Sequence, residues 1–275
     1  MRVRVVDACQ RAGQGGSPTA VVDDTSSLTD AERRAVPGSA GTSHAVFISA
    51  EEHGWLLRFF TATGELPACG HGTVAALAVL AERARSTRYE TVLRAGGRTF
   101  LGEATGGDGE YEAVFDPGPV ELRDPTATDR APILAALGVD ALAARIASVG
   151  RPRLLVEVAD RSTLADLAPD LTRLRAACDR AGLLGCYVYS TPSPDGRAAA
   201  RMFAPSIGVA EDIANANSTA CLAAHLAGRG SATLTVDMGD SLGRPATVIA
   251  SARPGPNGAL VRVGGKVADP DQLLG

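Results

Sequence analysis

The sequence predicts an α+β protein built from two similar halves. Short apolar runs separated by Gly, Pro, Asn and Asp indicate many short strands. Two alanine-rich helices, one in each half, are apolar on nearly every face, which is typical of helices buried by surrounding structure. An internal repeat relates the halves, since each places a strand and a small-residue turn directly before its apolar helix. The predicted class is therefore α+β with two pseudo-symmetric domains.

In the first half, strands are predicted where β-branched and aromatic residues lie between turn residues. Thr29 is a candidate N-cap with Glu32 at the capping-box spacing, so a short helix is expected over residues 29–35. The apolar helix of this half is expected over residues 73–85. The predicted strands cover residues 2–7, 19–22, 45–49, 55–60, 90–94, 97–103 and 111–115.

A turn-rich connection over residues 116–132 marks the expected domain boundary. We expect residues 1–118 to form the N-terminal half, with the tail 264–275 packing back on it, and residues 119–263 to form the C-terminal half. The second half is expected to contain helices over residues 133–137, 162–180 (broken near Pro169) and 218–227, and strands over residues 153–158, 186–190, 198–203, 231–237, 245–251 and 259–263.

The repeat aligns residues 58–73 with residues 201–219. Each segment starts with an arginine on a strand, continues to a glutamate and ends in a turn that opens the apolar helix. We expect these glutamates to be structural, pairing Glu65 with Arg58 and Glu211 with Arg201 or capping the turns. The alignment also sets Cys69 on Asn215, His71 on Asn217 and Thr73 on Thr219.

Both turns are expected to present backbone N–H groups at a helix N-terminus, where an anion such as a carboxylate can bind. Gly70 and Gly72 would let a ligand or another backbone approach closely. The alternative is a plain helix start, because most small-residue turns are only that.

Composition excludes several classes of function. The net charge is −4, so no basic surface is available in bulk and no nucleic-acid partner is expected. Lys266 is the only lysine among 27 basic residues and stands close to the C-terminal end, which argues against Schiff-base chemistry.

Cysteine spacing argues against a metal centre. Five cysteines stand at positions 9, 69, 178, 186 and 221, and no C-x-x-C pair occurs, so neither a zinc site nor a redox dithiol is predicted. No apolar run reaches the roughly 18 residues of a membrane span. We expect a reduced, cytoplasmic protein without metal or cofactor and without a membrane partner, and a chelator should leave its activity intact.

An ordered set of motifs carries a resemblance to a known family. The chain resembles the PhzF-like isomerases, which are named for phenazine biosynthesis and belong to the diaminopimelate epimerase superfamily. The motifs span nearly the whole chain: Gly16-Ser-Pro18, Glu65-Leu-Pro-Ala-Cys-Gly-His-Gly-Thr73, Gly150-Arg-Pro-Arg153, Arg201-Met-Phe-Ala-Pro205 with Glu211-Asp212, and Gly243-Arg-Pro245.

The resemblance implies both fold and chemistry. Each domain would be a curved, mostly antiparallel sheet wrapped around a central helix, with the active site between the two domains. It implies proton transfer without metal or organic cofactor, a small-molecule carboxylate as substrate, a homodimer, and a role in specialised-metabolite (antibiotic) biosynthesis.

Two departures from the family pattern bear on catalysis. The family usually has a Ser-Glu pair after the first short helix, with the glutamate as acid/base. Here Ser43 matches the serine, and His44 replaces the glutamate. We predict that His44 is the base and that the rate depends on one ionisation near neutral pH. In the second turn Asn215, Ala216 and Asn217 replace the usual Thr-Gly-Ser.

The resemblance also assigns substrate-binding residues. His71 matches the family's histidine that contacts substrate, and Asp212 matches an aspartate that holds a polar group of the substrate. The alternative for Asp212 is a helix-leading aspartate that satisfies N–H groups. The expected substrate-binding set is Ser43, Gly70, His71, Gly72, Asn215, Ala216 and Asn217, with His44, Asp212 and Cys69 as candidate catalytic residues.

The expected reaction is a proton and double-bond shift in a small unsaturated amino- or imino-acid carboxylate. A first alternative is an amino-acid racemase or epimerase that uses Cys69, because the superfamily's two-thiol racemases have a catalytic cysteine there and a helix N-terminus favours thiolate. The counterpart of Cys69 is Asn215, however, so a symmetric two-cysteine enzyme is not expected. A second alternative is an inactive relative that binds a small molecule.

Overall fold

The computed structural model describes residues 2–24, 28–228, 233–255 and 258–268. The chain divides into two compact units. Unit 1 contains Met1–Pro117, Arg244–Thr247 and Arg262–Gly275; unit 2 contains Gly118–Gly243 and Val248–Val261. Within the described residues, no helix is both long enough and apolar enough to cross a bilayer.

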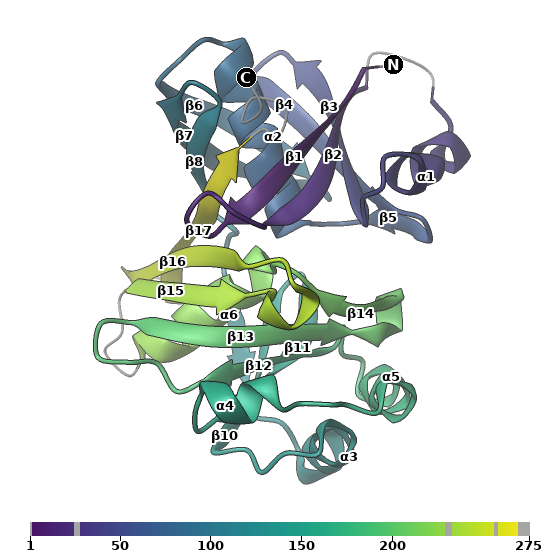
Figure 1. The fold of residues 1–275 in the computed structure, drawn as a ribbon, viewed down its shortest axis with the longest axis vertical. Coiled ribbons are helices and arrows are strands. Elements are labelled where there is room, and N and C mark those ends of the chain that lie inside the picture. Colours follow the sequence, from purple (N-terminus) through teal and green to yellow (C-terminus); the bar gives the residue numbers. More distant parts are fainter. Residues whose placement is uncertain (1, 25–27, 229–232, 256–257, 269–275) are drawn as a thin grey trace. The chain divides into compact units, whose positions relative to one another are not determined.

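Unit 1 contains a closed ring of strands (Figure 1). Pairing runs from β17 through β1, β2, β3, β4, β6, β7 and β8 back to β17, with β2–β3 and β4–β6 parallel and the other pairs antiparallel. The bounds are β1 (Val3–Gln10), β2 (Ser17–Asp23), β3 (His44–Glu51), β4 (Gly54–Thr61), β6 (Arg88–Ala95), β7 (Arg98–Gly107), β8 (Glu110–Phe115) and β17 (Gly258–Ala268). Because the ring is closed, each of these strands has a hydrogen-bonded neighbour on both sides.

The predicted C-terminal tail, residues 264–275, is described as far as Ala268, and residues 269–275 lie outside the described part. Ala268 pairs with Asp7 on β1 and with Glu110 on β8. This strand therefore joins the two ends of the N-terminal sheet.

Helix α2 (Gly70–Arg83) lies inside the ring and contacts β1, β2, β3, β6, β7 and β8 (Figure 1). Its residues from Gly70 to Ala81 are all buried, as expected for a helix apolar on every face. The helix begins three residues before the expected start at Thr73, because Gly70, His71 and Gly72 form its first turn.

Helix α1 (Asp30–Ser39) packs outside the ring, with Val36 against Val22 and Phe47. The predicted capping box is confirmed: Thr29 Oγ1 accepts from Glu32 N, and the Glu32 carboxylate accepts from Thr29 N at 2.7 Å. The short strand β5 (Gly64–Leu66) pairs with β4 and leads into the α2 turn.

Unit 2 is a mixed sheet with helices on both faces (Figure 1). Its strands are β9 (Glu121–Arg123), β10 (Ala143–Val149), β11 (Arg151–Val158), β12 (Cys186–Ser190), β13 (Arg197–Ala204), β14 (Val209–Asp212), β15 (Thr233–Met238) and most of β16 (Ala246–Gly255). β11–β12 and β13–β15 are parallel, and the pairs β9–β10, β10–β11, β12–β13 and β13–β14 are antiparallel.

Alternation along β11 separates the two faces of this sheet, since successive strand residues point to opposite sides. Leu154 and Val156 join a core with helices α3 (Ala127–Leu137), α4 (Arg161–Ala165) and α5 (Leu171–Arg180). Arg153 instead contacts Cys221 of α6 (Ala216–Ala227), the second buried apolar helix.

Two expectations for unit 2 are wrong. Residues 116–132 are not a plain connection, because they contain β9 and the first half of α3, which Thr126 and Asp129 open with a capping box. Strand β10 was not expected, since its alanine-rich sequence has low β-propensity; pairing with β9 and β11 overrides that preference. The break expected near Pro169 is confirmed, because it separates α4 from α5.

The internal repeat recurs as matching side-chain contacts. The Arg58 guanidinium binds the Glu65 carboxylate at 2.7 Å and lies 5.0 Å from the centroid of the Phe60 ring. In unit 2, Arg201 binds Glu211 at 2.8 Å and lies 5.0 Å from the centroid of the Phe203 ring. The expected structural role of both glutamates is therefore confirmed.

Candidate functional site in unit 1

His44 is the first residue of β3, at the point where the chain enters the ring. The strand is a continuous apolar run in a parallel pair with β2, with His44 opposite Thr19. Thr42 fixes the approach to this strand, because its hydroxyl donates to the His44 carbonyl at 2.9 Å. The imidazole of His44 is therefore held at the edge of the buried core.

Cys69 and His71 lie at the N-terminus of α2. Cys69 is the N-cap, but its side chain accepts no capping hydrogen bond from the first turn. The Thr73 hydroxyl donates to the Cys69 carbonyl at 2.9 Å and closes the turn. A Cβ added at Gly72 would lie 3.0 Å from Cδ1 of Phe59 and 3.1 Å from Sγ of Cys69, so glycine permits the close packing of this turn.

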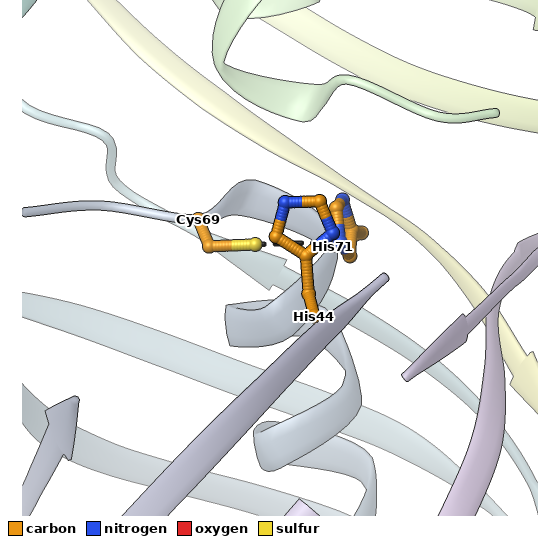
Figure 2. Close-up of side chains that lie close together, drawn as sticks. All are labelled: His44, Cys69 and His71. Carbon is orange, nitrogen blue, oxygen red and sulfur yellow. Dashed lines mark hydrogen bonds between the residues drawn. The ribbon is translucent and has the colours of Figure 1, made fainter. Parts of the chain in front are cut away.

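The side chains of His44, Cys69 and His71 converge in unit 1 (Figure 2); we call them the His–Cys–His cluster. Sγ of Cys69 lies 3.4 Å from Nε2 of His71. The His44 and His71 rings meet edge to face, with centroids 4.5 Å apart and planes at 82°. The three side chains are buried: His44 is 4% exposed, Cys69 6% and His71 2%.

Nδ1 of His44 lies 2.8 Å from Oγ of Ser43, which fixes the orientation of the ring. Burial lowers the pKa of His44 well below its usual 6.5, and the neighbouring His71 lowers it further. The imidazole is therefore neutral at pH 7. We therefore expect the ionisation of His44 that controls the rate to lie at lower pH than that of a free imidazole, because burial disfavours the imidazolium.

The depressed pKa of His44 predicts a pH-dependent stability. The unfolded chain binds a proton at this residue near pH 6.5, whereas the folded chain does not until lower pH. Stability from this residue is thus complete above pH 6.5 and is lost as the pH falls, by at most about 1.4 kcal/mol per pH unit. Urea unfolding at pH 7 and pH 5 should show a smaller loss in His44→Gln than in the wild type; equal losses would contradict the assignment.

The candidates of unit 2 form a second group around the start of α6. Asp212 ends β14 and is 8% exposed. Nδ2 of Asn215 donates to the Asp212 carboxylate at 2.9 Å, and Oδ1 of Asn215 accepts from Ser218 N at 2.9 Å. Asn215 is therefore the helix cap, and both ends of its amide are used within the protein. Ala216 and Asn217 form the first turn behind it.

The two helix starts therefore differ. The α6 turn is capped by Asn215, whereas the Cys69 side chain does not cap α2. In both, a threonine hydroxyl donates to the carbonyl of the N-cap residue: Thr73 to Cys69 at 2.9 Å and Thr219 to Asn215 at 3.1 Å. The uncapped turn in unit 1 is the better candidate for binding an anion.

Two features of the sites were not predicted. Arg153 is buried beneath α6 and donates to Sγ of Cys221 at 3.3 Å and to the Arg151 carbonyl at 2.7 Å; its only signal in the sequence is the Gly150-Arg-Pro-Arg153 motif. The second is that the His–Cys–His cluster has the donor atoms of a metal site. The spacing of the cysteines does not indicate this cluster, because its third member, His44, comes from β3 whereas Cys69 and His71 lie at the start of α2.

Comparison with known proteins agrees with this fold and these motifs. The family model of phenazine biosynthesis-like proteins, PhzC-PhzF, matches residues 6–269. A protein from Pseudomonas fluorescens named trans-2,3-dihydro-3-hydroxyanthranilate isomerase is 27% identical over 257 residues, which cover 90% of this chain and 89% of that protein. A protein from Deinococcus radiodurans named as an uncharacterized isomerase is 29% identical over 258 residues, covering 85% and 80% of the two chains.

Solved structures show the same fold. A protein from Pseudomonas aeruginosa named as a predicted epimerase superposes with a TM-score of 0.81 at 26% identity, over 97% of this chain and 96% of that chain. A PhzF-family phenazine biosynthesis protein from Bacillus anthracis superposes with a TM-score of 0.82 at 18% identity, over 98% and 97% of the two chains. The match to the family model over nearly the whole length establishes that the chain belongs to the PhzC-PhzF family of phenazine biosynthesis-like proteins.

Proposed function

We propose that this protein is an isomerase that moves a proton and a double bond in a small unsaturated carboxylate, with His44 as the base. The observation that carries the proposal is the buried imidazole of His44, which contacts the Ser43 hydroxyl through Nδ1 and meets the His71 ring edge to face. Membership of a family with members named as isomerases supports the reaction class.

The proposed step needs no redox partner. The free nitrogen lone pair of His44 takes a proton from a carbon next to the conjugated system, and the C–H electron pair moves into that system. The imidazolium then returns a proton to another carbon, which shifts the double bond and restores neutral His44. Because burial destabilises the imidazolium, return of the proton is favoured.

Binding of the substrate carboxylate is assigned to the start of α2. The Cys69 side chain caps none of the first N–H groups, and the helix dipole favours an anion there. His71 stands in the same turn and contacts the His44 ring, so a substrate held there would lie beside the base. The developing negative charge in the substrate would be stabilised by the same turn.

The test uses trans-2,3-dihydro-3-hydroxyanthranilate, the compound in the name of the Pseudomonas fluorescens relative, and smaller unsaturated amino acids. We expect a change in the ultraviolet spectrum together with deuterium uptake from D₂O for at least one of them. Prior treatment with a chelator should leave the rate unchanged, since the proposed chemistry uses side chains alone. A rate abolished by the chelator and restored by zinc would refute this mechanism.

The second candidate function is a racemase or epimerase with Cys69 as the base. The contact of 3.4 Å between Sγ of Cys69 and Nε2 of His71 favours it, because an adjacent imidazole can take the thiol proton. Inversion at one carbon leaves the ultraviolet spectrum unchanged, whereas a shifted double bond does not. A chiral separation of the products together with the spectrum distinguishes the two reactions. Binding without deuterium exchange would instead support an inactive, ligand-binding relative.

A further inference from the structure

The His–Cys–His cluster has the composition and the spacing of a metal site. One ligand atom from each of His44, Cys69 and His71 lies within 4.8 Å of the other two. Among the residues that the structure describes, no other group of three His, Cys, Asp or Glu side chains is arranged this way. One thiolate sulfur and two imidazole nitrogens suit zinc-like cations rather than magnesium or calcium, which prefer oxygen ligands.

The distances agree with a shared ion. Zinc binds sulfur at about 2.3 Å and nitrogen at about 2.0–2.1 Å, so a tetrahedral site places these two ligand atoms about 3.5 Å apart. Sγ of Cys69 and Nε2 of His71 are 3.4 Å apart before any ion is added. His44 comes from β3 and completes the group, because its ring meets the His71 ring edge to face (Figure 2).

We propose that the His–Cys–His cluster binds one divalent zinc-type cation through Sγ of Cys69 and one ring nitrogen each of His44 and His71, with the fourth position open. Binding releases the thiol proton to the buffer and changes no oxidation state. Ser43 would act as the outer partner of the site, because its contact with Nδ1 of His44 orients the ring. Three protein ligands and one open position are typical of exchangeable or catalytic zinc sites.

The consequence for activity rests on the proposed function. A bound cation would occupy the lone pair with which His44 accepts the proton. Zinc should therefore inhibit turnover reversibly, and a chelator should restore the metal-free rate. Direct binding is measured separately, so the metal site and the isomerase function can fail independently.

The binding test is a titration of the full-length, chelator-treated protein with Co²⁺, followed by absorption spectroscopy. We expect a 1:1 complex with a thiolate-to-cobalt charge-transfer band and the intense visible bands of tetrahedral cobalt, both displaced by Zn²⁺. Cys69→Ser should lose the charge-transfer band. His44→Gln and His71→Gln should each weaken binding at least about 10-fold, because losing a ligand costs at least as much as losing its outer partner.

Matched controls use residues of the same types outside the cluster. His53→Gln changes a side chain that is 87% exposed, and Cys178→Ala removes a thiol from the core of unit 2. Both variants should bind Co²⁺ like the wild type, and melting curves should show that all variants are folded. An absent charge-transfer band in the wild type, or one that persists in folded Cys69→Ser, would overturn the proposal. If zinc stimulates turnover, the result would support the metal site and contradict the metal-free isomerase mechanism.

Discussion

Replacing His44 by alanine should lower turnover by roughly 10²–10⁴-fold, which is the contribution of a positioned base, and should abolish deuterium uptake from D₂O. His44→Gln should have the same effect on turnover. Glutamine keeps a polar group next to Ser43 and fills most of the space, but it cannot carry a proton at neutral pH. Two inactive variants with normal melting would therefore assign the loss to chemistry rather than to unfolding.

Cys69→Ser is the matched variant within the same cluster. It retains the backbone N–H groups of the α2 turn, so most of the activity should remain if His44 is the base. In this variant, as in the wild type, the turnover rate should fall only below pH 6.5, because burial depresses the pKa of His44. An active His44→Ala together with an inactive Cys69→Ser would reverse the roles, making the thiolate the base and placing the racemase ahead of the isomerase.

Asp212→Asn should lower turnover by about 10²-fold or more if the carboxylate holds a polar group of the substrate, as the family resemblance implies. The substitution keeps the size of the side chain and removes its charge. Folding should change little, because Asn215 and not Asp212 caps α6. Steady-state kinetics and thermal melting of the same preparation measure the two effects.

The control for this variant is Asp160→Asn, a change of the same type at an exposed helix cap. The Asp160 carboxylate accepts from Thr163 N at 2.8 Å, and an asparagine amide oxygen can accept the same bond, so the variant should keep its stability and its full turnover. If Asp212→Asn keeps full turnover, as Asp160→Asn should, Asp212 is a structural residue and does not hold the substrate.

Local sequence signals predicted the elements that depend on local physics. The Thr29 capping box, the two apolar helices and the break near Pro169 follow from side-chain chemistry within a few residues. The arginine–glutamate pairs were predicted because the repeat placed both members at equal positions. The substrate-binding set and the homodimer stay predictions.

Features that depend on long-range pairing could not be predicted. Strand β10 exists because β9 and β11 flank it, and its alanines gave no strand signal. The tail 264–275 is expected from the sequence to pack back on the N-terminal half, but that residues 263–268 pair with β1 and β8 is known only from the structure. The His–Cys–His cluster could not be predicted without knowing that His44 at the start of β3 meets His71 in the first turn of α2, which the spacing of cysteines does not encode.

The closing strand of the ring also constrains how the chain can fold during synthesis. Residues 3–115 supply β1 to β8 of unit 1, but β17 emerges only after the whole of unit 2 has been made. Until then β1 and β8 lack their shared neighbour and expose unpaired backbone groups that can recruit another chain. The nascent protein must therefore protect two open strand edges through most of translation, so conditions that slow elongation should raise its aggregation more than they raise that of a protein whose sheet closes early.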